Sequence, residues 1–436
     1  MVNKKNKFNN FLSKNTFVVY GLGLTGLSII KFFKKKNVTF FAWDDNLSVQ
    51  ASQKINKDTE KIFPQILDGS DWILLSPGID INRSKFKKEL NRNKEKIITD
   101  LDLFYYLNPK VKSIVVTGSN GKSSTCKMIE HIFKKNNINI KLGGNFGRPV
   151  LNLKLKKKDI IIIEASSFQL FYSKFIRPDF AIILNITNDH LDWHLTKTNY
   201  IESKFKIFSN QNKNNYAYLS DNKLIKIYKK KRLKAKLKKV KVKKLNLLRN
   251  NIKNKYLVSK INLDNISFAY EISKKFKIKD YLFIKAINSF KGLEHRYELF
   301  FSKNGIKFIN DSKATSFESS KFAIKSNKNV YWIVGGLPKK GDHFKIDSLK
   351  NKIKKAYIIG NFTKYFKNQL NGKVSFQVSK KLNVAVKSII NNLKNKNKDA
   401  TVLFSPASAS YDQFKNFEDR GNQFKRLILK NASRIN

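Results

Sequence analysis

Residues 117–124, with the sequence TGSNGKSS, combine residue types that bind a nucleotide phosphate. Gly118 and Gly121 would let backbone N–H groups and the start of a helix hold phosphate oxygens. Lys122 would reach the terminal phosphates, and the Ser123 hydroxyl could ligate Mg²⁺. The common phosphate loop has four residues between its glycines, whereas this one has two. The pattern predicts a phosphate-binding loop; the alternative is an ordinary glycine turn that begins a helix.

Two apolar runs further along the chain end in residues that could bind a metal ion. The run at 159–163 ends at Glu164, and the run at 180–184 is followed by Asp189 and His190. Continuous apolar runs are typical of strands that are buried on both faces of a parallel sheet. A carboxylate and an imidazole at adjacent strand ends, beside a phosphate loop, predict a magnesium site. Taken singly, the carboxylate could be a solvated strand end and the imidazole an ordinary loop histidine.

A second glycine motif lies near the N-terminus. Gly21, Gly23 and Gly26 form a G-x-G-x-x-G pattern between a strand-like run at 16–20 and a helix-like run at 25–36. This order is typical of a dinucleotide-binding unit, in which a pyrophosphate lies at the helix N-terminus. A nicotinamide-dependent dehydrogenase would explain this motif, but it would leave the TGSNGKSS loop without a function.

Two further strand-like runs complete this first segment. The run at 38–43 ends in Asp44 and Asp45, where the fingerprint expects an acidic residue. The run that begins at Asp71 leads into a tight turn formed by Ser76, Pro77 and Gly78. Ligands bind at the carboxyl ends of strands in open parallel sheets, so both strand ends are candidate contacts for a nucleotide.

These motifs belong to three successive segments in which strand-like and helix-like runs alternate, which predicts an α/β fold. The chain has 436 residues, 41% of them hydrophobic, which is enough for about two to four domains with ordinary cores. No run of 18 apolar residues is present, so no membrane span is expected. The single cysteine, Cys126, excludes an internal disulfide framework and is expected in a reducing cytosol as a buried structural thiol.

The formal net charge of +56 could indicate nucleic-acid binding. However, only ten of the 88 basic residues are arginine, the residue on which base and phosphate recognition mostly depends. Lysine, asparagine and isoleucine share AT-rich codons, so genome composition explains the excess. The densest run, 223–260, alternates lysine with aliphatic residues and predicts a solvated strand face or surface loop.

The motifs, taken together and in order, resemble those of the Mur ligases. Besides TGSNGKSS, the chain contains GGNFGRP (143–149), EASSFQL (164–170), NITNDHLDWH (185–194), YIESKFKIF (200–208), GLEHRYE (292–298), INDSKATS (309–316) and SPASASYDQFKNFEDRG (405–421). The resemblance implies an α/β protein of three domains. These are an N-terminal Rossmann-like domain that binds a UDP-linked precursor (1–100), a central P-loop ATPase-like parallel-sheet domain (101–292) and a C-terminal Rossmann-like domain that binds the amino acid (293–436).

The resemblance also implies an ATP-dependent ligation that proceeds through an acyl phosphate, with two Mg²⁺ ions. The motif after Ser405 is similar to that of family members that add D-glutamate to UDP-MurNAc-L-alanine. Such an enzyme is expected to be a cytoplasmic monomer with no nucleic-acid partner. Two alternatives stay open: another amide ligase of the same architecture, including a folylpolyglutamate synthase-like one, and a basic nucleic-acid-binding P-loop ATPase.

The resemblance assigns roles to individual residues around ATP and the metal. Lys204 corresponds to a lysine that is carbamylated in the family, with Lys206 as the competing assignment. Expected metal ligands are Ser123, Glu164, His190 and carbamylated Lys204. Expected catalytic residues are Lys122, Asn145, Glu164, His190 and Lys204. Expected ATP contacts are Gly118, Ser119, Asn120, Gly121, Lys122, Ser123, Ser124, Asn265, Arg296, Asp311 and Lys313.

The remaining assignments concern the other two substrates. Asn46 stands where relatives often have arginine, which could weaken the hold on the nucleotide diphosphate. Either Lys339 or Lys340 is expected to hold the side-chain carboxylate of D-glutamate. The other D-glutamate contacts implied are Thr315, Ser410 and Phe417. The UDP-precursor contacts implied are Leu24, Thr25, Asp44, Asp45, Ser76, Pro77, Gly78, Ser166 and Gln169.

Overall fold

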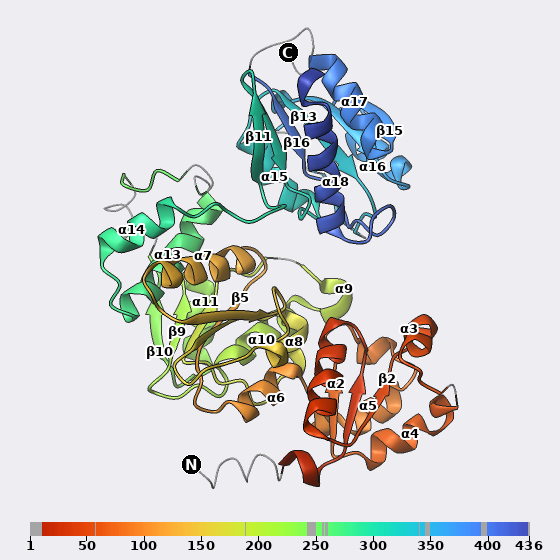
Figure 1. The fold of residues 1–436 in the computed structure, drawn as a ribbon, viewed down its shortest axis with the longest axis vertical. Coiled ribbons are helices and arrows are strands. Elements are labelled where there is room, and N and C mark those ends of the chain that lie inside the picture. The colour runs from red at the N-terminus through yellow and green to blue at the C-terminus, as the bar shows by residue number, and fades with distance from the viewer. Residues whose placement is uncertain are drawn as a thin grey trace. The chain divides into compact units, whose positions relative to one another are not determined.

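The computed structural model describes residues 11–434 except 57, 188, 242–249, 255–256, 258–259, 340, 345–348 and 394–398. The chain divides into two compact units: residues 1–253 with 260–289, and residues 254–259 with 290–436. The first unit contains two sheets and the second contains one (Figure 1). This arrangement confirms the predicted α/β class with three sheet-based domains.

The N-terminal sheet has four parallel strands in the order β2-β1-β3-β4. Helix α2 covers one face, and α4 and α5 cover the other, so apolar side chains fill a core on each side. The strands are β1 (Phe17–Tyr20), β2 (Phe40–Trp43), β3 (Trp72–Leu75) and β4 (Ile97–Ile98), and the helices are α2 (Leu24–Lys36), α3 (Leu47–Ser52), α4 (Thr59–Gly69) and α5 (Lys87–Arg92).

The register of this sheet aligns the ends of its three longer strands. Tyr20, the last residue of β1, pairs with Trp43 of β2 and with Leu75 of β3. The next residues along the chain are Gly21, Asp44 and Ser76, and they therefore lie together at one edge of the sheet. The glycine motif and the two polar strand ends predicted from the sequence thus converge.

The central sheet has six parallel strands in the order β10-β9-β8-β5-β7-β6. Strand β5 lies between β8 and β7: Thr117 pairs with Ile183, and Val116 pairs with Glu164. The loops that follow these three strands are therefore neighbours. The strands are β5 (Lys112–Thr117), β6 (Ile140–Gly144), β7 (Ile160–Glu164), β8 (Phe180–Ile183), β9 (Tyr216–Leu219) and β10 (Lys236–Lys239).

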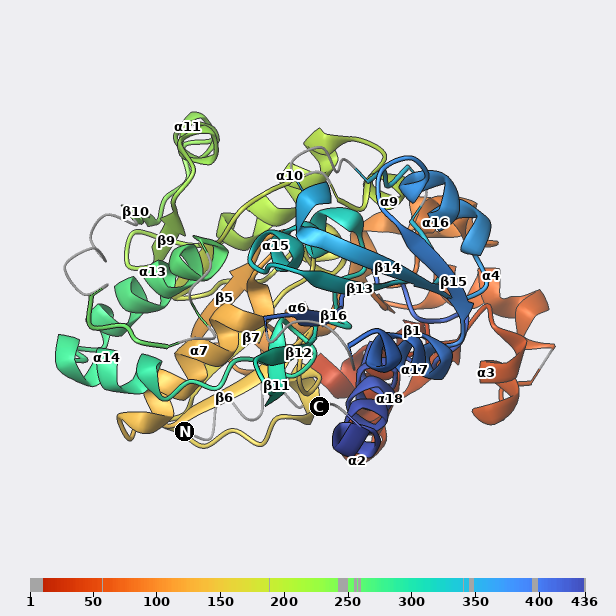
Figure 2. The ribbon, with the colours of Figure 1, turned by 90° about the horizontal axis from the view of Figure 1, so that it is seen from above.

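Helices cover both faces of the central sheet. One face packs against α6, α8, α10 and α11 through a single apolar cluster. The other packs against α7, and α13 lies beside α7 (Figures 1 and 2). The helices are α6 (Asp100–Leu107), α7 (Lys122–Lys135), α8 (Ser167–Tyr172), α9 (Leu191–His194), α10 (Lys197–Phe205), α11 (Asn222–Lys230), α13 (Lys260–Lys275) and α14 (Asp280–Asn288).

The second unit is built on six strands in the order β11-β12-β16-β13-β14-β15, of which only β11 is antiparallel to its neighbour. Helices α15 and α16 pack on one face, and α17 and α18 on the other. The elements are β11 (Glu298–Lys303), β12 (Ile306–Asn310), α15 (Phe317–Lys325), β13 (Val330–Gly335), β14 (Ile353–Ile359), α16 (Thr363–Leu370), β15 (Phe376–Lys380), α17 (Leu382–Leu393), β16 (Thr401–Phe404) and α18 (Phe417–Lys430).

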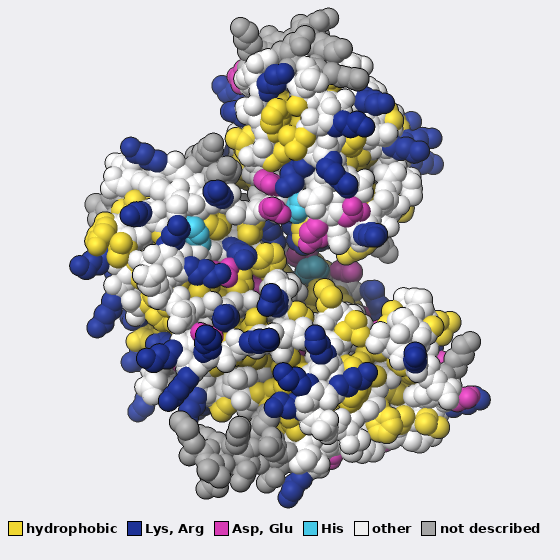
Figure 3. Space-filling model, viewed as in Figure 1, with side chains coloured by type: hydrophobic (Ala, Val, Ile, Leu, Met, Phe, Trp, Pro, Cys, Tyr) yellow, Lys and Arg dark blue, Asp and Glu magenta, His cyan; other side chains and the backbone are white. Residues whose placement is uncertain are grey.

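The densest basic run contains an amphipathic helix, α11, and an edge strand, β10, whose residues are mostly exposed. Strand β10 fits the predicted solvated strand face, whereas a helix at 222–230 was not expected. Residues 242–249, 255–256 and 258–259 of this run lie outside the described part. On the face drawn in Figure 3, lysine and arginine side chains are scattered among other side chains rather than gathered in one stripe. Of the described helices, none is both long and apolar enough to cross a membrane.

Candidate functional site

The TGSNGKSS segment forms the turn between β5 and the N-terminus of α7, as its sequence predicts. Gly118 and Gly121 adopt φ values of 151° and 87°, which residues with a side chain rarely adopt. A Cβ atom at Gly121 would lie 2.4 Å from Oδ1 of Asn265, so a side chain there would have to displace that amide. The first turn of a helix directs its backbone N–H groups out of the helix end, which is where an anion binds.

Polar contacts fix this turn to the loop that follows β8. The Ser119 N–H donates to the carbonyl of Asn185 (2.9 Å), and the Asn120 N–H donates to the Asn185 side chain (2.9 Å). The Lys122 ammonium donates to the carbonyls of Gly118 (2.9 Å) and Ser119 (3.0 Å). The lysine is therefore held directly over the turn, where a phosphate would meet it.

Ser123, Glu164 and Asn145 meet beside the turn. The Ser123 hydroxyl donates to one carboxylate oxygen of Glu164 (2.6 Å), and the Asn145 amide donates to the other (3.0 Å). Ser123 and Glu164 are each only 2% exposed. Hydroxyl and carboxylate oxygens are hard donors that suit Mg²⁺, which commonly completes its shell with phosphate oxygens and water. The residues therefore fit the magnesium site predicted from the sequence.

Among the described residues, no three His, Cys, Asp or Glu side chains form a metal-binding group of their own. His190 lies in a left-handed conformation (φ 54°) at the start of α9, with its Nε2 3.4 Å from an oxygen of Asp189. Its ring packs edge-on against Phe168. A second metal site at this histidine stays a prediction.

Lys204 and Lys206 point to different places. Lys204 is 1% exposed, and its ammonium donates to the carbonyl of Gly118 (3.1 Å) in the phosphate turn. Burial, followed by the charge of Lys122, holds the pKa of Lys204 well below its usual value, against the opposing effect of Asp189 and Glu164. Lys206 instead donates to the carbonyl of Phe171. Of the two lysines proposed for carbamylation, the geometry favours Lys204.

His194 was not singled out by sequence reasoning, although it is more buried than His190. It is 2% exposed, its Nε2 is 3.0 Å from the Ser167 hydroxyl, and aromatic rings including Phe168 and Tyr200 surround it. Burial lowers its pKa to about 4, so it is neutral at physiological pH. We interpret it as a structural residue between α8 and α10.

Asn265, expected near adenine, reaches the phosphate turn from α13. Its side chain lies against Gly121, and it is 1% exposed. Its Nδ2 has no hydrogen-bond partner among the described residues. A buried amide donor without an acceptor costs free energy, and a nucleotide could supply that acceptor.

The N-terminal sheet edge forms a second candidate site. The Asp44 carboxylate accepts the Leu22 N–H (2.6 Å), and the Ser76 hydroxyl donates to the carbonyl of Gly21 (2.6 Å). A Cβ atom at Gly26 would lie 2.0 Å from that same carbonyl, so only glycine lets α2 approach so closely. The arrangement leaves the N-terminus of α2 bare, as an anion site requires.

Other predicted UDP contacts surround this edge. Asp45 accepts from the Tyr20 hydroxyl (2.7 Å) and the Trp43 indole (3.1 Å), so it is oriented by its neighbours. Leu24 is 84% exposed at the start of α2, where an apolar side chain is free to cover a ligand. Asn46 caps α3 by accepting from the Ser48 N–H, a role that an arginine at this position could not fill.

Ser166 and Gln169 form the N-terminal capping box of α8. The Gln169 side-chain oxygen accepts the Ser166 N–H (3.1 Å), while its nitrogen lies 3.3 Å from Asp100. Asp100 begins α6, is 3% exposed and was not identified from the sequence. It positions the capping box, and Glu164 lies only two residues before that box.

Replacing Asp100 with asparagine should stabilise the protein increasingly as the pH rises from about 4 to about 6.5. Burial raises the pKa of Asp100 to about 6, against about 3.9 in an unfolded chain. The folded state therefore binds the proton more tightly, and ionisation above pH 6 destabilises it by about 3 kcal/mol at most. Asparagine keeps the acceptor for Gln169 without the charge.

Urea unfolding of both proteins at pH 4.5 and pH 7.5, followed by circular dichroism, measures this effect. The stability difference between variant and wild type should be larger at pH 7.5. A difference that is the same at both pH values would contradict the account.

The second unit gathers other predicted residues after β12. Asp311 is 9% exposed; its carboxylate accepts from the Ser405 hydroxyl (2.7 Å) and from the Tyr297 N–H (3.0 Å). Burial raises its pKa to about 7, while Arg296 nearby acts to lower it. Asp311 and Arg296, both expected near ATP, therefore lie near each other.

Lys313 and Phe417 also meet, with the ammonium 3.7 Å from the ring centroid. Ser410 is buried, whereas Thr315 and Lys339 are half-buried. Lys340 lies outside the described residues. The motifs 309–316 and 405–421 are thus brought together, although a D-glutamate site formed by them remains a prediction.

Arg420 joins these two motifs and was not identified from the sequence. Its fully buried guanidinium donates to the carbonyls of Ser312 (2.7 Å), Ser408 (3.0 Å) and Ala409 (3.2 Å) and to the Ser312 hydroxyl (3.1 Å). Burial lowers its pKa to about 10, so it still carries its charge at physiological pH. It therefore sets the separation of the two loops.

Changing Arg420 to lysine should destabilise the second unit by about 2 kcal/mol or more, because buried acceptors lose their donors. Arg426→Lys is the matched control: it makes the same change at an exposed position of the same helix, α18. Thermal unfolding of both variants tests this expectation. Equal melting temperatures for the two would show that the buried guanidinium is not needed.

Comparisons with known proteins agree with this arrangement. Residues 116–283 match the Mur ligase middle domain, and residues 15–98 match the N-terminal domain of the Mur ligase MurD-like type. Among solved structures, MurC from Thermotoga maritima has a TM-score of 0.57 at 14% identity, covering 95% of this chain and 99% of its own. MurF from the same organism, in complex with ADP, has a TM-score of 0.56 at 15% identity, covering 86% and 92%. At these identities the likeness concerns the fold alone.

Closer sequence relatives carry one shared name. A UDP-N-acetylmuramoylalanine–D-glutamate ligase of Rickettsia felis is 34% identical, covering 98% of this chain and 99% of the relative. The ligase of the same name from Fusobacterium nucleatum is 34% identical, covering 95% and 98%. With full-length similarity and matching domains, the chain belongs to the Mur ligase family.

Proposed function

We propose that this protein is an ATP-dependent ligase that adds D-glutamate to UDP-N-acetylmuramoyl-L-alanine. The observation that carries the proposal is the convergence of Lys122, Ser123, Glu164 and Lys204 around one glycine turn. Supporting it are relatives of this name along the full chain and the residues 405–421 that resemble theirs.

A free carboxylate is a poor electrophile because its leaving group would be oxide. In the proposed reaction, the precursor carboxylate attacks the γ-phosphate of ATP and releases ADP, giving an acyl phosphate. The amine of D-glutamate then attacks the acyl carbon and expels phosphate. The first step brings the anionic carboxylate against the anionic triphosphate, so fixed positive charge is needed at the site.

The residues around the turn would supply this environment. Lys122 would release the loop carbonyls and contact the β- and γ-phosphates. Ser123 and Glu164 would hold Mg²⁺, which would neutralise phosphate charge when bound. Asn145 would orient the Glu164 carboxylate and lie near the acyl group. Lys204, as its CO₂ adduct, would present a carboxylate in place of an ammonium.

The N-terminal sheet edge is proposed to hold the UDP moiety. Its glycine motif and bare helix N-terminus suit a pyrophosphate, which both UDP and a dinucleotide contain. This accounts for a Rossmann-like motif without a nicotinamide. In the second unit, the two motifs that Arg420 joins would bind D-glutamate.

Isotope transfer tests this chemistry. With ¹⁸O in the alanyl carboxylate of the precursor, the acyl-phosphate route moves one labelled oxygen into the released phosphate. Mass spectrometry should find labelled phosphate and a product heavier than the precursor by D-glutamate minus water. Product without label in the phosphate would contradict the acyl-phosphate step, and absence of the product would contradict D-glutamate addition.

A further inference from the structure

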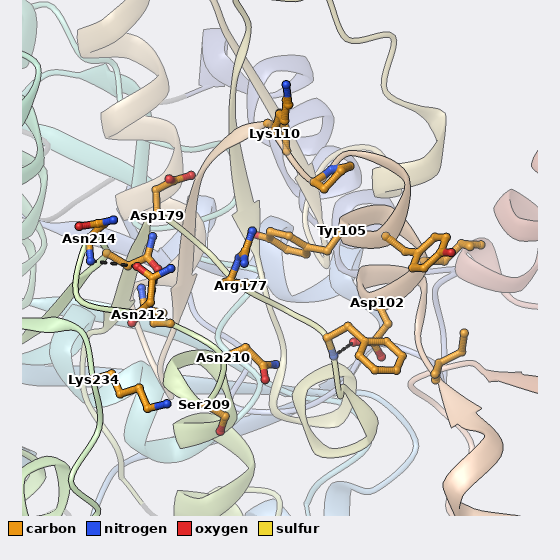
Figure 4. A pocket seen from close by; sticks show the side chains of 18 of the residues that line it. Asp102, Tyr105, Lys110, Arg177, Asp179, Ser209, Asn210, Asn212, Asn214 and Lys234 are labelled. Atoms are coloured by element: carbon orange, nitrogen blue, oxygen red, sulfur yellow. Dashed lines mark hydrogen bonds between the residues drawn. The ribbon is translucent and has the colours of Figure 1, made fainter. Parts of the chain in front are cut away.

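A large cavity in the first unit lies away from the phosphate turn (Figure 4). Its volume is about 920 Å³, within the range of small-molecule sites. Val111, Asp179 and Asn215 line it, and each directly precedes a strand: β5, β8 and β9 respectively. The cavity is therefore at the amino ends of the central strands, whereas the phosphate turn follows their carboxyl ends.

One wall of the cavity is aromatic. Tyr105 and Tyr106 of α6 line it together with Phe11, Trp72 and Phe175. The rings of Phe11 and Tyr106 lie 4.1 Å apart, and those of Trp72 and Phe175 lie 6.1 Å apart. Such a wall favours a planar apolar group.

Much of the rest of the lining is polar and includes positively charged side chains. Arg177, Lys110 and Lys234 line the cavity, and Figure 4 shows Arg177 extending towards Tyr105. Among the described residues, nothing pairs with the Arg177 guanidinium. A planar guanidinium without a partner is suited to a carboxylate, sulfonate or phosphate.

Two carboxylates, Asp102 and Asp179, also line the cavity. Asp102 accepts the backbone N–H groups of Lys174 (2.9 Å) and Phe175 (2.7 Å). Asp179 accepts the N–H of Ser113 (2.8 Å). Backbone N–H groups hold both carboxylates in place, and the three cations of the lining, Lys110, Arg177 and Lys234, exceed these two carboxylates by one.

Gln211 adds a polar side chain to the lining. This lining residue is 2% exposed, and its side-chain nitrogen donates to the carbonyls of Pro178 (2.8 Å) and Tyr216 (3.2 Å). Its Oε1 has no hydrogen-bond partner among the described residues. This oxygen is also shielded from solvent, so a molecule in the cavity does not reach it.

We propose that this cavity binds a small organic anion that carries a planar ring system. The anionic group pairs with Arg177, and the ring lies on the Tyr105–Tyr106 wall. Because the cavity is on the opposite edge of the sheet from the phosphate turn, the anion binds without displacing a nucleotide.

The probe 8-anilinonaphthalene-1-sulfonate has both features, and its fluorescence rises on binding. Titration into the full-length protein at about 0.2 M salt, which screens loose surface attraction, should saturate at one site. Arg177→Gln should weaken binding about tenfold or more, through loss of a charge-assisted hydrogen bond. Lys230→Gln, which removes an exposed charge on α11, is the control and should leave the affinity unchanged.

Competition with ADP and Mg²⁺ tests whether the probe binds away from the phosphate turn. Fluorescence that persists in excess ADP supports the proposal. Non-saturable binding, equal affinity of the Arg177→Gln variant and wild type, or displacement of the probe by ADP would each overturn it. The test does not depend on ligase activity, so it stands apart from the proposed function.

Discussion

Lys122→Ala is expected to lower the rate of ligation by about 100-fold or more. In the structure this ammonium is held over the phosphate turn by the carbonyls of Gly118 and Ser119. Removing a fixed charge that faces the transferring phosphate typically costs a factor of this size, because the developing negative charge loses its partner. The loss should appear in kcat, since the charge matters most in the transition state.

The matched control is Lys127→Ala, five residues further along α7. Lys127 pairs with Glu130 on the helix surface and does not contact the turn. Steady-state kinetics of both variants, with ATP varied, measures the difference. A Lys122→Ala enzyme within tenfold of wild type would refute the phosphate-loop assignment.

Lys204→Ala should be nearly inactive and should regain part of its activity with acetate or propionate. Burial holds the pKa of Lys204 well below its usual value, so a larger share of this amine is neutral and able to react with CO₂. The adduct is a carboxylate, which a short carboxylic acid could replace in the space that alanine leaves. The expected loss is again about 100-fold or more, because the site loses an anionic ligand for the metal.

Lys206→Ala provides the comparison, because this side chain donates to the carbonyl of Phe171 instead of the turn. It should stay close to wild type and should not respond to acetate. Activity assays with and without acetate decide between the two lysines. The acetate concentration is about 50 mM, because a free carboxylate that replaces a tethered one must be present at high concentration. Full activity of Lys204→Ala, or a loss confined to Lys206→Ala, would reverse the assignment.

The phosphate turn could be predicted from sequence because its signals are local. Glycines, lysine and serine lie within a few residues, between a strand and a helix, and the structure places them as expected. The meeting of Ser123 with Glu164 follows from parallel strands that end at one edge. That β5 lies between β7 and β8 is a matter of strand order, which the sequence does not state.

Residues whose partners are distant in the chain were missed. Asp100 contacts Gln169, 69 residues away, and Arg420 contacts Ser312, 108 residues away. One is an acid at a helix start and the other a base within a helix, and both would normally be exposed. Only the assembled packing shows that they are buried. The sequence favoured Lys204 over Lys206 for carbamylation only through the family resemblance. Residues two apart on a helix point to different sides, and the sequence does not say which side faces inward.

The most direct test of the central claim is phosphate release from ATP in the presence of Mg²⁺ and UDP-N-acetylmuramoyl-L-alanine, with one amino acid added at a time. The account predicts release that requires both the precursor and D-glutamate, with little from L-glutamate, L-lysine or D-alanine. Release with a different amino acid would keep the ligase chemistry but contradict the acceptor assigned to the second unit. Release driven by DNA or RNA without the precursor would contradict the proposed function altogether.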